Sequence, residues 1–525
     1  MRRPDFYPAH PERVELRETH ISWVFLAGDR VYKVKKPLTL PFLDYGSRER
    51  RRLMCHEEVR LDSRLAPGVY LGVVSIVRTP AGFALAAPER EDAVDYAVEM
   101  RRLPEQRTLA RLLSGGGTPA GAIPAVARRL ADFHRRAEQS PAGFGGPRSV
   151  RAALDETSET LLELGPAVPA AEVRALARAL DGFAWERRTL LRDRAAGDLV
   201  RECHGDLRAE HVVLDESLEI IDGVEFDPEL RHIDVSADLA FLVMDLEALG
   251  RPELAGELEH EYRAAGGDPG PPQLLAFYAA YRAGVRAKVA ALRAAQLSGQ
   301  DGHAEAVAAA RALLRLARRF SWRARLPLVL VLCGVSASGK SYLAERLAEL
   351  SGLPHVSSDL VRKRLAGLAP TDRGGSPLYT DAVSDRTYRE LGERAAAALG
   401  SHGGAIVDAT CRRAAHRRAL RGGLGEQAAP LVFVECVAPA GVRLDRARRR
   451  QADPARISDA GVEVIERQVL EWEPLDEIPP NRHLLLRTDR PAPESIGGLE
   501  ALLDLALSGA RAEPRATEEH PLSGA

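Results

Sequence analysis

The eight residues from Gly334 to Ser341, Gly-Val-Ser-Ala-Ser-Gly-Lys-Ser, constrain the fold of this chain more than any other segment. They match the pattern G-x-x-x-x-G-K-[ST], in which a glycine-rich backbone cradles phosphate groups. An apolar run at 328–333 precedes the motif and predicts a buried parallel strand. Apolar residues at helical spacing follow it over 342–350. We therefore predict a strand, a phosphate-binding loop and a helix whose N-terminus faces an anion.

This loop is the first candidate site. Lys340 would reach the terminal phosphates of a nucleotide, and the Ser341 hydroxyl would coordinate Mg²⁺. The chain has only six lysines among its 73 Lys and Arg residues, and a lysine is the compact point charge that suits a triphosphate. The predicted nucleotide-binding residues of the loop are Gly334, Ser336, Ala337, Ser338, Gly339, Lys340 and Ser341.

Composition narrows the class of protein. A length of 525 residues predicts two or three domains, and 45% hydrophobic with 28% charged residues is typical of soluble globular proteins. The net charge of −2 gives no overall field that would attract nucleic acid. Five widely spaced cysteines without a C-x-x-C pair argue against a disulfide framework or a zinc site. Without a signal-peptide core or an apolar run long enough to span a membrane, we expect a cytoplasmic protein with no membrane partner.

The order of apolar segments predicts the domain organisation. Residues up to about 105 read as strand-rich with one helix near 48–65, and residues from about 106 to 318 read as mostly helical with a strand pair near 211–222. We expect a first domain at 1–320, with lobes at about 15–105 and 106–318, a linker at 321–327 and a P-loop domain at 328–495. The remainder, 496–525, drifts into Glu, Pro, Ala and Ser, which predicts a disordered tail.

A second set of motif residues lies between 203 and 226. The segment Cys-His-Gly-Asp-Leu-Arg-Ala-Glu-His ends at His211, and a short apolar strand then leads to Asp222. An H-x-D loop followed by an aspartate after a strand is how the protein-kinase fold builds its catalytic end. Asp206 would orient the acceptor hydroxyl and take its proton, and Asp222 would hold the metal that bridges the phosphates. The alternative is two exposed acidic turns at the ends of a hairpin.

This stretch resembles the aminoglycoside phosphotransferase and choline kinase branch of that fold, whose loop reads H-G-D, over roughly residues 15–315. The resemblance implies an ATP-binding lysine on the third strand, for which Lys33 is preferred to Lys35. It also implies a helix glutamate that pairs with this lysine, for which Glu58 is preferred to Glu57. Asp238 is expected to brace the catalytic loop.

The chain departs from this family at His211, which occupies the position of a metal-binding Asn. An imidazole is a poor substitute because Mg²⁺ prefers hard oxygen ligands. The departure leaves two interpretations open for this domain, an active phosphotransferase and a degenerate one that binds nucleotide without catalysis.

Charged residues after the phosphate-binding loop indicate which reaction takes place at that loop. Asp359 and Arg362 form a D-x-x-R pair on one helical turn, where the carboxylate can activate an attacking hydroxyl and the guanidinium can grip an anionic substrate. Asp408 ends a third apolar segment, the usual place of a metal-binding carboxylate. Arg446 and Arg450 lie i, i+4 on one helix face and would close as a lid that neutralises transition-state charge. The alternative for these two arginines is a solvated basic helix.

This second set resembles the small P-loop kinases around polynucleotide kinase, gluconate kinase and zeta-toxin-like enzymes. The pattern S-S-D-x-x-R, then V-D-A-T, then 458–460 with Gln468 and 473–474, is similar to a kinase domain of AAA type over about residues 326–490. Taken in this order, the two halves resemble a bacterial family of fused proteins.

We therefore predict a two-domain protein with an N-terminal α+β protein-kinase-like bilobal fold and a C-terminal α/β P-loop kinase fold with a parallel sheet. The predicted function is ATP-dependent phosphotransfer with Mg²⁺, in which the P-loop domain transfers the γ-phosphate to a hydroxyl of a small molecule or, less favoured, of a nucleic-acid end. Two alternatives stay open. The N-terminal domain could be a pseudokinase that regulates the P-loop kinase, or the chain could be an ATP-dependent switch or nucleic-acid end-processing factor.

Overall fold

The computed structural model describes residues 1–40, 43–80, 82–117, 119–372, 376–426, 429–451 and 461–507. It divides into two compact units, the first made of Met1–Glu156 and Arg187–Arg286, the second of Thr157–Glu186 and the chain from Ala287 onward. The second unit therefore contains segments that the sequence analysis assigned to the first domain. The expected domain limits, 1–320 and 328–495, stay a prediction.

The first unit contains a six-stranded antiparallel sheet in the order β1-β2-β3-β8-β6-β7. Its strands are β1 (Val14–Glu18), β2 (Ser22–Ala27), β3 (Arg30–Lys35), β6 (Tyr70–Thr79), β7 (Gly82–Ala86) and β8 (Ala93–Arg101), with a small separate pair β4 (Thr39–Leu40) and β5 (Leu43–Asp44). Helix α1 (Arg48–Asp62) packs against β6 and β8. A strand-rich segment with one helix near 48–65 was predicted here, and the sheet and α1 confirm it.

The rest of this unit is helical and holds the H-G-D loop between short strands. The helices are α2 (Leu109–Ser114), α3 (Ala122–Arg136), α6 (Arg188–Ala196), α7 (Pro228–Arg231), α8 (Val235–Ala248) and α9 (Pro252–Ala264), while α4 (Pro147–Glu163) and α10 (Pro272–Gln296) have residues in both units. The short strands are β9 (Val200–Glu202), β10 (Val212–Leu214), β11 (Leu218–Ile220) and β12 (His232–Asp234). An antiparallel sheet followed by a helical part with this loop is the predicted kinase-like fold.

The second unit is built on a five-stranded parallel sheet in the order β14-β15-β13-β16-β17. The strands are β13 (Leu328–Cys333), β14 (His355–Ser357), β15 (Gly404–Asp408), β16 (Leu431–Val437) and β17 (His483–Arg487). The helices are α5 (Ala170–Glu186), α11 (His303–Arg323), α12 (Lys340–Ser351), α13 (Ser358–Leu365), α14 (Asp381–His402), α15 (Ala414–Leu424), α16 (Ala440–Gln451), α17 (Val462–Leu470) and α18 (Ala492–Leu507). This architecture confirms the predicted α/β P-loop fold.

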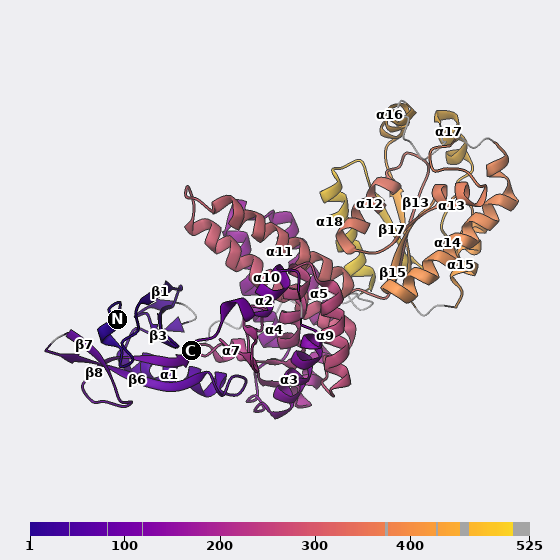
Figure 1. Cartoon of the computed structure of the whole chain (residues 1–525). Coiled ribbons are helices and arrows are strands. Elements are labelled where there is room, and N and C mark those ends of the chain that lie inside the picture. The colour runs from indigo at the N-terminus through magenta and orange to yellow at the C-terminus, as the bar shows by residue number, and fades with distance from the viewer. Residues whose placement is uncertain are drawn as a thin grey trace, which may run out of the picture. The chain divides into compact units, whose positions relative to one another are not determined.

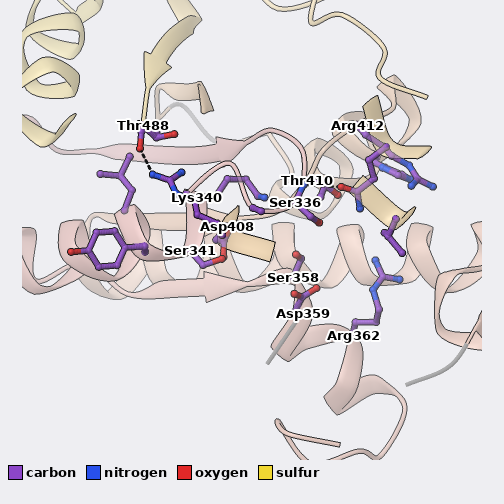
Figure 2. A pocket seen from close by; sticks show the side chains of 18 of the residues that line it. Ser336, Lys340, Ser341, Ser358, Asp359, Arg362, Asp408, Thr410, Arg412 and Thr488 are labelled. Carbon is purple, nitrogen blue, oxygen red and sulfur yellow. Dashed lines mark hydrogen bonds between the residues drawn. The ribbon is translucent and has the colours of Figure 1, made fainter. Parts of the chain in front are cut away.

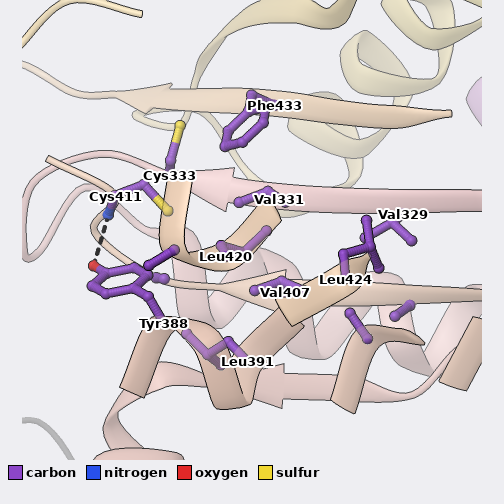
Figure 3. Close-up of a cluster of buried hydrophobic side chains, with 14 of the residues drawn as sticks. Val329, Val331, Cys333, Tyr388, Leu391, Val407, Cys411, Leu420, Leu424 and Phe433 are labelled. Atoms are coloured by element: carbon purple, nitrogen blue, oxygen red, sulfur yellow. Dashed lines mark hydrogen bonds between the residues drawn. The ribbon is translucent and has the colours of Figure 1, made fainter. Parts of the chain in front are cut away.

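Side chains of the central strand β13 enter two different cores because they alternate across the sheet. Val329 and Val331 pack with residues of α14 and α15, as Figure 3 shows. Leu330 and Leu332 pack on the other face with residues of α12 and α18. In Figure 1, α12 and α18 accordingly lie on one side of the sheet and α14 and α15 on the other. All six residues of β13 are buried, which explains why its sequence is a continuous apolar run.

Order extends further toward the C-terminus than the sequence indicated. Residues 496–507, expected to begin a disordered tail, continue helix α18. Ile496, Leu499 and Leu503 recur at helical spacing and are buried in the core beside α12, so this segment is an amphipathic helix rather than a tail. The expected tail beyond Leu507 lies outside the described residues.

Helices α14 and α15 cross so closely that two glycines are required where they meet. A Cβ atom on Gly392 of α14 would clash with the backbone oxygen of Leu420 and would lie 2.6 Å from the amide nitrogen of Leu424, both in α15. Gly423 of α15 likewise faces the backbone of Arg389 in α14. The backbones must therefore separate to admit any side chain at either position.

We expect Gly392→Ala to lower the free energy of unfolding by about 1–3 kcal/mol or more, because overpacking against backbone cannot be relieved by a rotamer change. Gly400 offers a matched control on the same helix, since a Cβ there meets nothing within 4 Å. Gly400→Ala should be neutral or stabilise by up to about 1 kcal/mol, as alanine favours helix over glycine. Thermal unfolding of both variants measures the difference, and equal midpoints would contradict the close crossing.

None of the helices in the described ranges combines the length and apolar character needed to cross a membrane. The five cysteines all fall in the described part of the chain; each is buried and none forms a disulfide.

Candidate active site

The phosphate-binding loop connects β13 to α12, as predicted, and its glycines are required by the backbone. Gly334 and Gly339 have φ angles of 130° and 98°, in the region that side chains disfavour. A Cβ on Gly334 would lie 2.6 Å from the backbone oxygen of Cys436. Ala337 also has a positive φ, 63°, a strained conformation of the kind that concentrates at functional sites. The loop thus has a tight backbone shape that its glycines make possible.

Lys340 begins helix α12 and its side chain is buried, with Nζ donating a hydrogen bond to the backbone oxygen of Val335 at 3.1 Å. This bond folds the lysine back over the loop. The amide of Ser336 donates to Oε1 of Gln468 at 2.7 Å, so a residue of α17 also contacts the loop. Ser338 is fully buried and its hydroxyl has no partner among the described residues.

Asp408 ends β15, the strand beside β13, and stands close to Ser341 at the start of α12. Burial by itself would raise the pKa of Asp408, but the neighbouring His355, whose Nε2 lies 3.8 Å away, the charge of Lys340 and the nearby Ser341 hold it below its ordinary value. Asp408 is therefore an ionised carboxylate. A carboxylate and a hydroxyl are the hard oxygen ligands that Mg²⁺ prefers, so this pair would fit that ion.

One cavity of about 1010 Å³ brings the predicted residues together. Lys340, Ser341, Asp408 and the pair Asp359 and Arg362 all line it, as Figure 2 shows for the labelled side chains. They converge because β13, β14 and β15 are parallel, and the carboxyl ends of parallel strands meet at one edge of the sheet. Ser336, Ala337 and Gly339 also line the cavity, whereas Gly334 and Ser338 lie behind it.

Arg446 of α16 closes the cavity over the loop. Its Nη2 donates to the backbone oxygen of Thr488 at 2.6 Å, and its Nη1 lies 3.1 Å from where a Cβ on Gly339 would stand. That Nη1 is buried without a partner among the described residues, which leaves it able to donate to a bound nucleotide. Arg450 lies in the same helix, but its side chain is outside the described residues, as is the predicted segment 458–460.

The far end of the cavity contains Thr410 of the V-D-A-T motif and three residues that the sequence analysis missed, Arg412, Tyr388 and His416. Arg412 and Thr410 follow β15, Tyr388 projects from α14 and His416 from α15, and all line the cavity. Tyr388 fixes the turn after Asp408, because its hydroxyl accepts from the amide of Cys411 and bonds Thr410 Oγ1, both at 3.0 Å. Cys411 has a φ of 50°, a second strained position. The only sequence signal was the nearness of Arg412 to the V-D-A-T segment.

The first unit brings together the residues predicted for its own nucleotide site. Lys33 Nζ lies 2.8 Å from Glu58 Oε1 and 2.7 Å from Asp222 Oδ1. Burial by itself would lower the pKa of Lys33, but these carboxylates raise it well above its ordinary value. Lys35 shares Glu58 from the same strand face, at 2.7 Å, while Glu57 turns away to Arg60 and Arg231. Only Lys33 reaches the aspartate after the catalytic loop.

The side chains of Asp206 and His211 in the H-G-D loop both pair with Arg208. Arg208 donates to both carboxylate oxygens of Asp206, at 2.9 and 2.8 Å, and to Nε2 of His211 at 3.0 Å. The Nδ1–H of His211 donates to the backbone oxygen of Asp206 at 2.8 Å. Burial lowers the pKa of His211 to about 4, so the imidazole is neutral at physiological pH. Because Nε2 is engaged by Arg208, His211 fits a hard cation such as Mg²⁺ less well than Ser341 and Asp408 do.

Asp238 braces this loop, as expected. Its carboxylate oxygens accept from the amides of Gly205 and His204 at 2.8 and 3.1 Å, and His134 Nε2 lies 3.1 Å away. Gly205 has a φ of 86°, which explains a glycine at the centre of the H-G-D motif.

The fold and site together define a chain whose N-terminal part has a kinase-like fold with an H-G-D loop and whose C-terminal part is a P-loop domain on a parallel sheet. Residues 329–475 match the family model described as an AAA domain. Over 452 residues the chain is 34% identical to uncharacterized protein Rv2004c of Mycobacterium tuberculosis, covering 84% of this chain and 87% of the relative. The chain belongs to the family of this mycobacterial protein.

Solved structures resemble the two parts separately. A gluconokinase from Sinorhizobium meliloti is 25% identical over 35% of this chain and 93% of its own, with a TM-score of 0.26. A choline/ethanolamine kinase family protein from Mesorhizobium loti is 16% identical over 61% of this chain and 95% of its own, with a TM-score of 0.38.

Proposed function

We propose that the P-loop unit is a kinase that transfers the γ-phosphate of ATP to a hydroxyl group of a small molecule. The observation that carries this proposal is the single cavity that joins the phosphate-binding loop, the Ser341 and Asp408 oxygen pair, and Asp359. A P-loop with a metal-binding pair such as Ser341 and Asp408 is compatible both with ATP hydrolysis and with phosphate transfer to an acceptor. A carboxylate across the cavity from the loop lysine is what phosphate transfer to a hydroxyl additionally requires.

Each residue has a defined part in this reaction. The loop amides and Lys340 hold the β- and γ-phosphates and offset their charge. Ser341 and Asp408 would hold Mg²⁺, which when bound neutralises charge on the β- and γ-phosphates. The hydroxyl oxygen of the acceptor attacks the γ-phosphorus while the bond from that phosphorus to the departing ADP breaks. Asp359 accepts the proton of this hydroxyl. Arg446 donates to the phosphates above Gly339 and keeps water from the transferred group.

Asp359→Asn tests the assignment of the base. We expect it to reduce phosphate transfer by about 10²–10⁴-fold, since an amide cannot accept the hydroxyl proton, while ATP affinity stays within a factor of about two. The measurement is a screen of sugars, aminoglycosides, nucleosides, polyols with and without acidic groups and 5′-hydroxyl oligonucleotides, with products identified by mass spectrometry. A variant that transfers phosphate at the rate of the unmodified protein would remove Asp359 from the mechanism. Salt-sensitive binding and phosphorylation of the oligonucleotides alone would instead favour end processing of nucleic acid.

A second function is proposed for the first unit, that of a nucleotide-binding regulator rather than a catalyst. The observation that favours it is the engagement of Asp206 and His211 by one guanidinium, that of Arg208. A carboxylate held by both oxygens is less available to take a proton from an acceptor hydroxyl. The nucleotide-binding set of the unit is present, since Lys33 pairs with both Glu58 and Asp222, so nucleotide can still bind. This proposal requires that Asp206→Ala leaves phosphate transfer by the P-loop unit in place.

A further inference from the structure

Three nitrogen atoms at one end of the P-loop cavity are buried and lack hydrogen-bond partners among the described residues. They are Nε of Arg362, Nε of Arg412 and Nδ1 of His416. All three residues line the cavity. In Figure 2 the two arginines lie at the end away from Thr488, beyond Ser358 and Asp359. Buried nitrogens that find no partner within the protein are costly, so their convergence on a cavity indicates a ligand that satisfies them.

Arg362 gives the strongest support for such a ligand, because its charge is buried and no described carboxylate pairs with it. The residue is 7% exposed, and its guanidinium stacks over the Tyr379 ring at 4.9 Å. Its Nη1 donates to a backbone oxygen at 2.8 Å and to Ser384 Oγ at 3.4 Å. Within the described residues no carboxylate pairs with it. A buried cation held only by neutral groups is destabilising unless an anion binds beside it.

Arg412 and His416 contribute a second guanidinium and an imidazole to the same end of the cavity. Nη2 of Arg412 lies 3.2 Å from Glu471, which leaves Nε directed elsewhere. His416 stacks on Tyr388 with the rings 9° from parallel and their centroids 4.4 Å apart, so its orientation is fixed. Burial, reinforced by the charges of Arg412, Arg413 and Arg362, lowers the pKa of His416 to about 4. The guanidinium groups of these arginines are thus close enough to add positive charge at this end of the cavity.

We propose that Arg362, Arg412 and His416 form a binding site for an anionic group, a carboxylate or a phosphate monoester, on the acceptor. This inference rests on the proposed function, because it assigns the far end of the same cavity to the acceptor. Planar guanidinium groups match the paired oxygens of either anion. Arg362 follows Asp359 by one turn of α13, so an anion held there places the rest of the molecule beside the proposed base. The acceptor is therefore a small hydroxy acid or a hydroxyl-bearing phosphate ester rather than a neutral polyol.

The test measures anion binding without turnover. The full chain is saturated with Mg²⁺ and the non-hydrolysable analogue AMP-PNP, so that the P-loop is filled. The histidine NMR signals are then followed during titration with inorganic phosphate, with acetate and with neutral glycerol. His416→Gln identifies the signal of His416. We expect that signal to shift saturably with phosphate or acetate and not with glycerol, and the more effective ion identifies the acceptor group.

Two variants and one control decide the result. Arg362→Gln and Arg412→Gln should each raise the dissociation constant of the anion at least about tenfold, because each removes charge-assisted hydrogen bonds. Arg364→Gln is the control, since that arginine lies on the same helix with its side chain 71% exposed. A His416 signal that ignores both anions, or that responds equally in the Arg412→Gln and unmodified chains, overturns the inference even if Arg362→Gln fails to fold. Anion binding without any phosphate transfer would refute the proposed function and leave this site standing.

Discussion

Lys340→Ala is expected to reduce phosphate transfer at least about 10²–10³-fold, the usual loss when one preorganised electrostatic contact to developing charge is removed. The lysine is buried at the start of α12, between the phosphate-binding loop and Asp408. Alanine leaves the loop backbone unchanged but removes the one compact cation that can follow the γ-phosphate as it moves. Transfer rates at saturating ATP, with dissociation constants for ATP measured separately, distinguish the loss of catalysis from the loss of binding.

Stability gives an independent check on this variant. Among the described residues Lys340 donates one hydrogen bond, to the backbone oxygen of Val335, so we expect the unfolding temperature to change little. Glu349→Ala, a change at a 64% exposed side chain of the same helix, should leave both transfer and stability unaltered. Unimpaired transfer by Lys340→Ala would show that the reaction does not take place at this loop.

Glu500→Ala is expected to lower the free energy of unfolding of the second unit by about 3–5 kcal/mol, the cost of stranding a buried charge. Glu500 of α18 accepts from Arg318 of α11 with both oxygens, at 2.9 and 2.8 Å, and from Trp322 Nε1 at 2.9 Å. Its side chain is only 3% exposed. Without it, the indole N–H would lose its acceptor, and of the described carboxylates the guanidinium would keep only that of Glu172, 3.5 Å from its Nη1. Chemical denaturation followed by tryptophan fluorescence measures the effect.

The exposed Glu494, at the start of the same helix, provides the comparison. Glu494→Ala should cost only a few tenths of a kcal/mol, up to about 1, from the weakened interaction with the helix dipole. If both variants unfold alike, α11 does not pack on α18 as described. The same contacts imply that a fragment starting at Leu328 loses Arg318 and Trp322, and is less stable than one that retains α11.

The parts of the site that the sequence predicted are those encoded locally. The phosphate-binding loop is contiguous, and the strand and helix beside it have clear apolar periodicity. Asp408 ends the buried strand β15, and Asp359 lies in the first turn of α13 directly after β14. Both were predictable because parallel strands end at a common edge. The kinase-like loop was likewise readable from the order of His, Gly and Asp around Asp206.

The parts that were missed depend on packing between distant segments. Tyr388 and His416 reach the cavity only because α14 and α15 cross at Gly392 and Gly423, and neither helix carries a motif. The last turns of α18 carry leucines at helical spacing, but the partners that bury Glu500 there, Arg318 and Trp322, lie far earlier in the chain. Similarly, the sequence is rich in arginine, and nothing in it distinguished Arg208, whose guanidinium donates to Asp206 in the structure.

The most direct test of the account follows the γ-phosphate of labelled ATP in three proteins, the unmodified chain, Lys340→Ala and Asp206→Ala, with one panel of acidic and neutral hydroxyl acceptors. The account predicts that label appears in an acidic acceptor with the unmodified chain and with Asp206→Ala, and is lost with Lys340→Ala. Label transfer that survives Lys340→Ala and disappears in Asp206→Ala would contradict it, since the reaction would then belong to the kinase-like unit.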